Sequence, residues 1–202
     1  MKVFFQTEFD PLESMALDLC RGKILDVGAA AGRHSIELRR RGLRVCALDI
    51  LSEAAQILSD RGVTAPIVGD ILHWSGDQFD TVLMLMNGIG LVGTPEKLDE
   101  FLCHAPNLLT HGGQIICDSI DVSVSQTPTH VAYRENNLRK GLYPGQQCFS
   151  ISYAGQQGEI FPWLHLDAAC LSQHCRKANL DCNIVHKEAD GHYLVSIMKR
   201  SG

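Results

Sequence analysis

Apolar and polar residues alternate in blocks along the first part of the chain. Short apolar runs that end at glycine or a carboxylate predict buried strands of a parallel sheet, and the mixed stretches between them predict amphipathic helices. The predicted strands cover residues 23–27, 44–48, 64–68, 79–86 and 114–118. The predicted helices cover residues 11–20, 32–41, 52–62 and 95–109. Ser52 and Thr94 are the expected N-caps of the last two helices, and Gly112-Gly113 is expected to turn into the fifth strand. Strands and helices in this order predict an α/β fold with a doubly wound, Rossmann-like sheet.

The C-terminal part of the chain breaks this alternation. Residues 121–160 are polar, contain several glycines and prolines, and include the alternating stretch CFSISYA at residues 148–154. We interpret residues 121–160 as an insertion that carries a β-ribbon or lid over a substrate. A helix is expected to begin near Asp167, and strands at about residues 182–187 and 192–199 are joined by a short turn that indicates an antiparallel hairpin. The expected sheet is mostly parallel with an antiparallel C-terminal strand.

Length and composition indicate one globular domain over residues 1–202, in which residues 1–22 form a lead-in. The 202 residues are enough to bury a core, and the fractions of hydrophobic (45%) and charged (20%) residues are ordinary. The net charge of −5 disfavours a nucleic-acid partner, because nucleic-acid affinity comes mainly from clustered lysines and arginines. The basic run at residues 39–41 precedes Gly42 at the end of a predicted helix, where cations stabilise the helix terminus, so we interpret it as a cap.

The eight cysteines indicate neither disulfides nor a metal site. No C-x-x-C pair occurs, and the cluster of Cys170, Cys175 and Cys182 with His174 nearby fits no common zinc spacing, so no metal is predicted. The N-terminus has no basic-then-apolar signal sequence, and no apolar run reaches about 18 residues. We therefore expect a cytoplasmic protein with no membrane partner.

The most specific motif is ILDVGAAAGRHSIELRRRG at residues 24–42, where a predicted strand meets a turn of small residues and then a helix. A dinucleotide-binding turn needs a third glycine where this chain has Arg33, which disfavours a nicotinamide oxidoreductase. The spacing over residues 26–32 is instead D-x-G-x-x-x-G. Small residues could merely pack a strand against a helix, but Asp49 at the end of the next predicted strand favours a cofactor site.

This pattern resembles motif I of the class I S-adenosylmethionine-dependent methyltransferases, D/E-x-G-x-G-x-G, with Ala30 in place of the middle glycine. Through LMLMNGIGLVG, CDSID, FPWLHLD and GHYL the whole chain resembles a bacterial group of generic methyltransferases with no settled substrate. The resemblance implies the seven-stranded class I methyltransferase fold, S-adenosylmethionine as cofactor and S-adenosylhomocysteine as product. The cofactor-binding positions it implies are Asp26, Gly28, Ala30, Gly32, Asp49, Ile50, Gly69, Asp70, Ile71, Met86 and Asn87.

The resemblance gives each acidic residue a different part of the cofactor. Asp26 would accept a hydrogen bond from the ammonium group, directly or through water, and Asp49 would accept from both ribose hydroxyls. Asp70 would meet the adenine amino group and the backbone N–H of Ile71 an adenine ring nitrogen, although Gly-Asp is also a common turn pair. The sequence MNGIG at residues 86–90 would lie under the methionine moiety. It differs from the N/D-P-P-Y/F motif of amino-directed methyltransferases, which weakens a nucleobase-amine acceptor.

The residues that could contact the methyl acceptor follow the fifth predicted strand and the insertion. Asp118 and Asp121 would lie at the carboxyl edge of the sheet, where they could bind a substrate cation, act as a base, or only cap a polar loop. His192 is a further catalytic candidate, although a lone histidine is more often structural. The aromatic candidates could instead anchor a loop. The candidates for substrate contact are Asn87, Tyr153 and Trp163.

We therefore expect a methyltransferase that moves the sulfonium methyl to an O, N, S or C nucleophile by in-line displacement. The protein would mainly align the nucleophile, methyl and sulfur and exclude water. The short chain and acidic balance favour a small-molecule acceptor enclosed by residues 121–160. The alternatives are a protein or tRNA acceptor, a cofactor-binding module without catalysis, and the disfavoured oxidoreductase.

Overall fold

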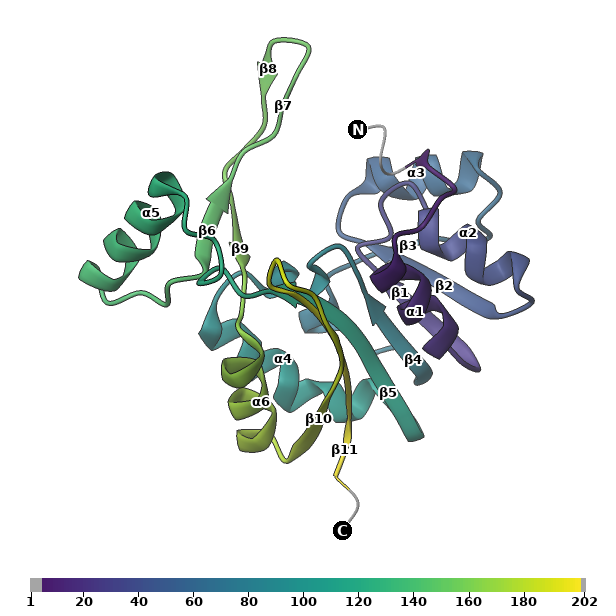
Figure 1. Ribbon diagram of the computed structural model, residues 1–202. Helices are drawn as coiled ribbons and strands as arrows, with labels where there is room; N and C mark the ends of the chain where they lie inside the picture. The colour runs from purple at the N-terminus through teal and green to yellow at the C-terminus, as the bar shows by residue number, and fades with distance from the viewer. Residues whose placement is uncertain (1–4, 201–202) are drawn as a thin grey trace.

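A computed structural model describes residues 5–200, apart from the side chain of Tyr153. Within these residues a seven-stranded sheet has the order β10-β11-β5-β4-β1-β2-β3 (Figure 1). Strands β1 to β5 pair in parallel, and β11 pairs antiparallel with both β5 and β10. The predicted mostly parallel sheet with an antiparallel C-terminal strand is confirmed. Its strands are β1 Lys23–Val27, β2 Arg44–Asp49, β3 Ile67–Val68, β4 Phe79–Met84, β5 Leu109–Ile120, β10 Leu180–Lys187 and β11 His192–Lys199.

Helices cover both faces of this sheet, as the strand sequences require. Successive residues of a strand point to opposite faces, and Ile24 and Leu25 of β1 accordingly lie in two different hydrophobic cores. The core around Ile24 includes residues of α1 and α2, and the core around Leu25 includes residues of α4 and α6. The helices are α1 Pro11–Leu19, α2 Arg33–Arg40, α3 Ser52–Asp60, α4 Pro95–Leu108, α5 Pro128–Arg139 and α6 Ala168–Lys177.

Polar residues begin several of these helices, and one predicted cap is wrong. Thr94 precedes α4 and accepts a hydrogen bond from the backbone N–H of Lys97, as the Thr-Pro-Glu sequence predicts. Ser52 does not cap α3, because it is the first residue of the helix and Leu51 occupies the cap position. The helix has no side-chain cap, and the backbone N–H of Leu51 donates to the carboxylate of Asp49.

Two strands differ from their predicted extents. β5 begins at Leu109, continues through the two glycines that were expected to turn, and has a register irregularity against β4. A Cβ on Gly113 would lie 2.8 Å from the carbonyl oxygen of Phe79, so this glycine permits close backbone approach within a strand rather than a turn. β3 is shorter than predicted and pairs only with the end of β2, at the edge of the sheet.

Residues 121–160 contain a helix and three strands of a long β-ribbon, whose fourth strand follows at residues 161–164. Figure 1 shows α5 beside the carboxyl edge of the sheet and the ribbon projecting beyond it. α5 was not predicted, because PTHVAYRENNLR has no apolar stripe at helical spacing and leaves Leu138 exposed. Its ribbon strands are β6 Gln146–Phe149, β7 Ser152–Tyr153, β8 Gln156–Gln157 and β9 Phe161–Leu164, paired antiparallel as β6 with β9 and β7 with β8.

Within residues 5–200, none of the helices combines the length and apolar character needed to cross a bilayer.

Candidate cofactor and acceptor site

The turn between β1 and α2 places three residues in the left-handed region of backbone conformation. Gly28, Ala30 and Gly32 have φ angles of 70°, 47° and 78°. A Cβ on Gly28 would lie 2.9 Å from Cδ1 of Leu91, and one on Gly32 would lie 2.6 Å from Cδ2 of Leu58. Both glycines are therefore favoured by conformation, and a Cβ at either position would also displace a leucine side chain. The turn forms a cradle of backbone at the carboxyl edge of the sheet.

The left-handed conformation of Ala30 yields a stability prediction. Ala30→Gly is expected to leave the free energy of unfolding unchanged or to raise it slightly. Glycine relieves about 1–2 kcal/mol of left-handed strain in the folded state, but it also stabilises the unfolded chain by about 0.4–1 kcal/mol through its greater entropy. Ala29→Gly, in the same turn at an ordinary φ, is expected to cost about 1 kcal/mol. Urea unfolding measures both free energies. Equal losses for the two variants would show that Ala30 is unstrained.

Asp49 ends β2 with its carboxylate over this cradle. Its Oδ2 accepts the backbone N–H of Ala30 at 2.9 Å, and its Oδ1 accepts that of Leu51 at 3.0 Å. A carboxylate oxygen can accept a second hydrogen bond, so both oxygens can still accept from a pair of hydroxyl groups. The next side chain, Ile50, is 65% exposed and offers an apolar surface beside the carboxylate. This combination suits a ribose joined to a flat base.

Asp26 lies beneath the cradle rather than on its open face. The residue is only 2% exposed, and its Oδ2 accepts a hydrogen bond of 2.5 Å from the hydroxyl of Ser35. Burial raises the pKa of Asp26, while the charge of His34 and the hydrogen bonds from Ser35 oppose that rise. The sequence allowed Asp26 to contact a cofactor ammonium group directly or through water. Because Asp26 is this deeply buried, we expect the contact through water.

The Gly69-Asp70-Ile71 segment lies beside the end of β2. The backbone N–H of Gly69 donates to the carbonyl oxygen of Asp49 at 2.9 Å. Asp70 caps the 3₁₀ helix Ile71–His73 by accepting the N–H of Leu72 at 2.9 Å. Asp70 therefore has the role of a turn residue, and the segment lies next to Asp49 at the end of β2.

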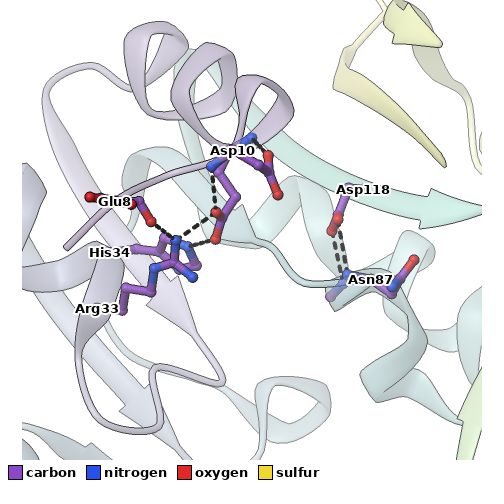
Figure 2. Close-up of polar contacts among 8 residues, drawn as sticks. Glu8, Asp10, Arg33, His34, Asn87 and Asp118 are labelled. Carbon is purple, nitrogen blue, oxygen red and sulfur yellow. Dashed lines mark hydrogen bonds and ion pairs between the residues drawn. The ribbon is translucent and has the colours of Figure 1, made fainter. Parts of the chain in front are cut away.

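The loop after β4 is held by Asp118. Met86 and Asn87 have φ angles of 65° and 58°, and Gly88 follows them. The two carboxylate oxygens of Asp118 accept the backbone N–H groups of Asn87 and Gly88 at 2.9 and 3.0 Å, and Figure 2 shows the carboxylate pointing at this backbone. Burial raises the pKa of Asp118 to about 6, although the hydrogen bonds from Asn87 and Gly88 oppose that rise. The geometry gives Asp118 a positioning role for this loop.

The same loop borders the cradle and carries an unsatisfied oxygen. Oδ1 of Asn87 is buried and makes no hydrogen bond with the described residues. Leu91, in the 3₁₀ helix Gly88–Val92 that follows, is the residue that a Cβ on Gly28 would meet. Because an unpaired buried acceptor is costly, this oxygen suits a ligand that donates a hydrogen bond, such as an ammonium group. The cradle, Asp49 and Asn87 together fit the parts of S-adenosylmethionine.

Sequence reasoning missed a buried ionic cluster behind the cradle. Glu13 of α1 accepts a hydrogen bond from Nη2 of Arg33 at 2.8 Å and pairs with Nε2 of His34 at 2.9 Å. Arg33 also donates to the carbonyl oxygen of Glu8 (Figure 2). Burial would raise the pKa of Glu13, but its hydrogen bonds with His34 and the Asp10 backbone bring it below the ordinary value. The D-P-L-E sequence, a capping-box pattern that this helix uses, was the available signal.

The remaining predicted site residues are in four different environments. Trp163 packs on the loop after β4, since a Cβ on Gly90 would lie 2.2 Å from its Nε1. Asp121 accepts the backbone N–H of Ser123, and Nδ1 of His192 lies 3.1 Å from a carboxylate oxygen of Asp190. Tyr153 is in β7, in the outer part of the ribbon away from the sheet (Figure 1), and its side chain lies outside the described part of the structure.

A cavity of about 430 Å³ lies between the end of β5, α5 and β6. This volume is within the range of small-molecule sites, roughly 300–1,000 Å³. Ile120, Val122, Tyr133 and Phe149 form apolar parts of its wall, and Asp121 and His165 are among its polar residues. Of the three predicted catalytic candidates, Asp118, Asp121 and His192, Asp121 is the one that lines this cavity.

Comparisons with known proteins agree with this geometry. Residues 24–113 match the family model of a methyltransferase domain. A SAM-dependent methyltransferase from Bacteroides fragilis, solved with S-adenosyl-L-homocysteine, is 28% identical with a TM-score of 0.87, over 99% of this chain and 81% of that chain. The CcbJ methyltransferase from Streptomyces caelestis shares the fold at 13% identity and a TM-score of 0.66, over 95% of this chain and 89% of that chain. Among curated proteins, none matches the sequence significantly.

The fold is that of the class I S-adenosylmethionine-dependent methyltransferases, and residues 24–113 match a methyltransferase domain, so the comparisons support a methyltransferase of this class. S-Adenosylmethionine is its cofactor, and the resemblance seen in the sequence is confirmed.

Proposed function

We propose that this enzyme methylates a small molecule that binds in the cavity between β5, α5 and β6, with residues 121–160 as its cover. The cavity is the observation that supports this acceptor class, because its volume is within the range of small-molecule sites. Ile120 on the cavity wall follows Asp118 by two residues, or roughly 7 Å of strand. Asp118 in turn holds the loop that carries Asn87. A small molecule in the cavity can therefore approach the methyl donor.

We further propose that the cofactor lies over the Gly28–Gly32 turn. Asp49 would accept from the ribose hydroxyls, Ile50 would cover the adenine beside Asp70 and Ile71, and Asn87 would accept from the ammonium group. S-Adenosylmethionine supplies a methyl group on a cationic sulfur, which is a good leaving group when the nucleophile attacks in line. The chain's own work is then to align the acceptor atom and to exclude water. Asp118 contributes by fixing the loop between the two binding sites.

Filling the mouth of the cavity tests this proposal. Thr129→Trp places an indole on the α5 wall and is expected to reduce turnover by about tenfold or more, while S-adenosylmethionine affinity stays unchanged, because acceptor and cofactor occupy separate volumes. Ala132→Trp, on an exposed α5 position outside the cavity lining, is the matched control and is expected to keep full turnover.

The measurement is release of S-adenosylhomocysteine by each variant in the presence of a metabolite extract, with cofactor affinity from calorimetry. Full turnover in Thr129→Trp would contradict the cavity as the acceptor site. Loss of cofactor binding in that variant would instead contradict the separation of the two sites.

We also propose a cytoplasmic location. All eight cysteines lie within the described residues and are free thiols, which is compatible with a reducing compartment.

A further inference from the structure

His165 lies on the cavity wall, on a backbone that is fixed to two strands of the sheet. Its N–H donates to the carbonyl oxygen of Gly145 at 2.9 Å. The next residue, Leu166, donates to the hydroxyl of Ser119 in β5 at 3.0 Å and accepts from the hydroxyl of Tyr193 in β11 at 2.7 Å. This anchoring holds the imidazole in one place at the carboxyl edge of β5.

The imidazole of His165 has no hydrogen-bond partner within the described residues. Nδ1 is buried and unpaired, and Nε2 makes no hydrogen bond either, although the residue lines the cavity. The ring packs against Phe149, with centroids 6.2 Å apart. Burial lowers the pKa of His165 to about 4, and the nearby charge of His192 adds to that effect. The ring is therefore neutral at pH 7 and keeps a free lone pair.

Three other polar residues on the wall already have hydrogen-bond or ion-pair partners. Oδ1 of Asp121 accepts the backbone N–H of Ser123. Asp190 accepts from the backbone of His192 and lies 3.1 Å from its ring, in an exposed turn. His130 is exposed, and its Nδ1 lies 2.6 Å from the hydroxyl of Ser125. His165 is the uncommitted base among these four.

We propose that the acceptor is a small aromatic compound with a hydroxyl group, and that Nε2 of His165 takes the hydroxyl proton as the oxygen is methylated. This inference rests on the proposed small-molecule function. The apolar and aromatic wall of Ile120, Val122, Tyr133 and Phe149 suits a flat ring. A neutral imidazole adds no positive charge beside a cationic methyl donor, and an amine acceptor would enter as a second cation next to that donor.

The atoms and electrons of the step balance without another reactant. A lone pair of the acceptor oxygen forms the new O–C bond, and the pair of the breaking C–S bond stays on sulfur. The O–H proton moves to Nε2 of His165, and the resulting imidazolium returns the proton to water. A weak base suffices, because the hydroxyl becomes strongly acidic as its oxygen takes the methyl group.

Histidine NMR of the full chain tests the contact independently of turnover. In the presence of S-adenosylhomocysteine, 4-methylphenol is expected to shift the ring nitrogens of His165 in a saturable manner, whereas toluene is expected to leave them unshifted. Unshifted His165 nitrogens with saturating 4-methylphenol, or the same shift with toluene, would overturn the hydroxyl contact.

Turnover of two phenols tests the proton transfer. His165→Gln is expected to lower kcat for 4-methylphenol by about 10²-fold or more with little change in KM. The loss is expected to be much smaller for 4-nitrophenol in mildly alkaline buffer, where this phenol is already ionised. His111→Gln, at an exposed position near the amino-terminal end of β5 and outside the cavity lining, is the matched control and is expected to keep both activities.

Equal losses of His165→Gln on both phenols would reduce His165 to a structural role and overturn its part in proton transfer. If the wild-type enzyme methylates other small molecules but neither phenol, the acceptor class is wrong while the proposed function stands. If it methylates no small molecule at all, the proposed function itself fails.

Discussion

Asp49→Ala is expected to weaken S-adenosylmethionine binding by about 10²–10⁴-fold, because each hydrogen bond to a charged acceptor is worth about 1.5–3 kcal/mol and two would be lost. The carboxylate is the group that ends β2 over the cradle, with both oxygens still able to accept hydroxyl groups. Titration calorimetry of the wild type and variant measures the loss directly.

Asp49 also accepts two backbone N–H groups, so the experiment needs two further variants. Asp49→Asn keeps one acceptor oxygen and is expected to bind the cofactor with intermediate affinity. Asp60→Ala removes an exposed carboxylate at the end of α3 and is expected to bind normally. Wild-type affinity in a folded Asp49→Ala variant would show that the cofactor lies elsewhere.

Glu13→Gln is expected to lower the free energy of unfolding by about 3–5 kcal/mol, because it removes the charge of one partner from the buried Glu13–Arg33 ion pair. The side chains of Glu13 and Arg33 are only 7% and 6% exposed. Asp18 lies on the same helix as Glu13, is 72% exposed and pairs with Arg41 at the end of α2. Asp18→Asn breaks this exposed pair and is expected to cost less than about 1 kcal/mol. Urea unfolding of the three proteins measures the difference.

The destabilisation by Glu13→Gln is also expected to depend on pH. The folded-state pKa of Glu13 lies below its ordinary value of 4.5, so its ionised form contributes stability above that value. As the pH falls below 4.5 toward the folded-state pKa, the wild type is expected to lose this contribution and approach the variant. A pH-independent gap, or a loss no larger than that of Asp18→Asn, would contradict a stabilising role for the buried cluster.

The sheet and the cofactor cradle could be predicted because local patterns encode them. Buried parallel strands are continuous apolar runs, and the residues at their carboxyl ends, such as Asp49, meet at one edge of the sheet. The glycine positions were equally readable, because left-handed turns and close packing leave few other residues possible. Gly113 was misread, since a glycine that permits close strand pairing looks the same in sequence as one that forms a turn.

The parts that escaped prediction depend on contacts between distant segments. Glu13 pairs with Arg33 across the α1–α2 packing, and Asp118 reaches a loop about thirty residues earlier in the chain. His165 gave no signal either, because its burial and lack of partners arise only when β5, β6 and β9 come together. α5 was missed for a different reason, since a helix on an exposed insertion needs no apolar stripe.

The central claim is methyl transfer from S-adenosylmethionine to a small molecule in the cavity beside β5. The most direct test incubates the enzyme with cofactor labelled in the methyl group and separately with the low-molecular-mass, protein and tRNA fractions of a bacterial lysate. We expect label in a low-molecular-mass product, formed in equal amount with S-adenosylhomocysteine. Label confined to protein or tRNA would contradict it.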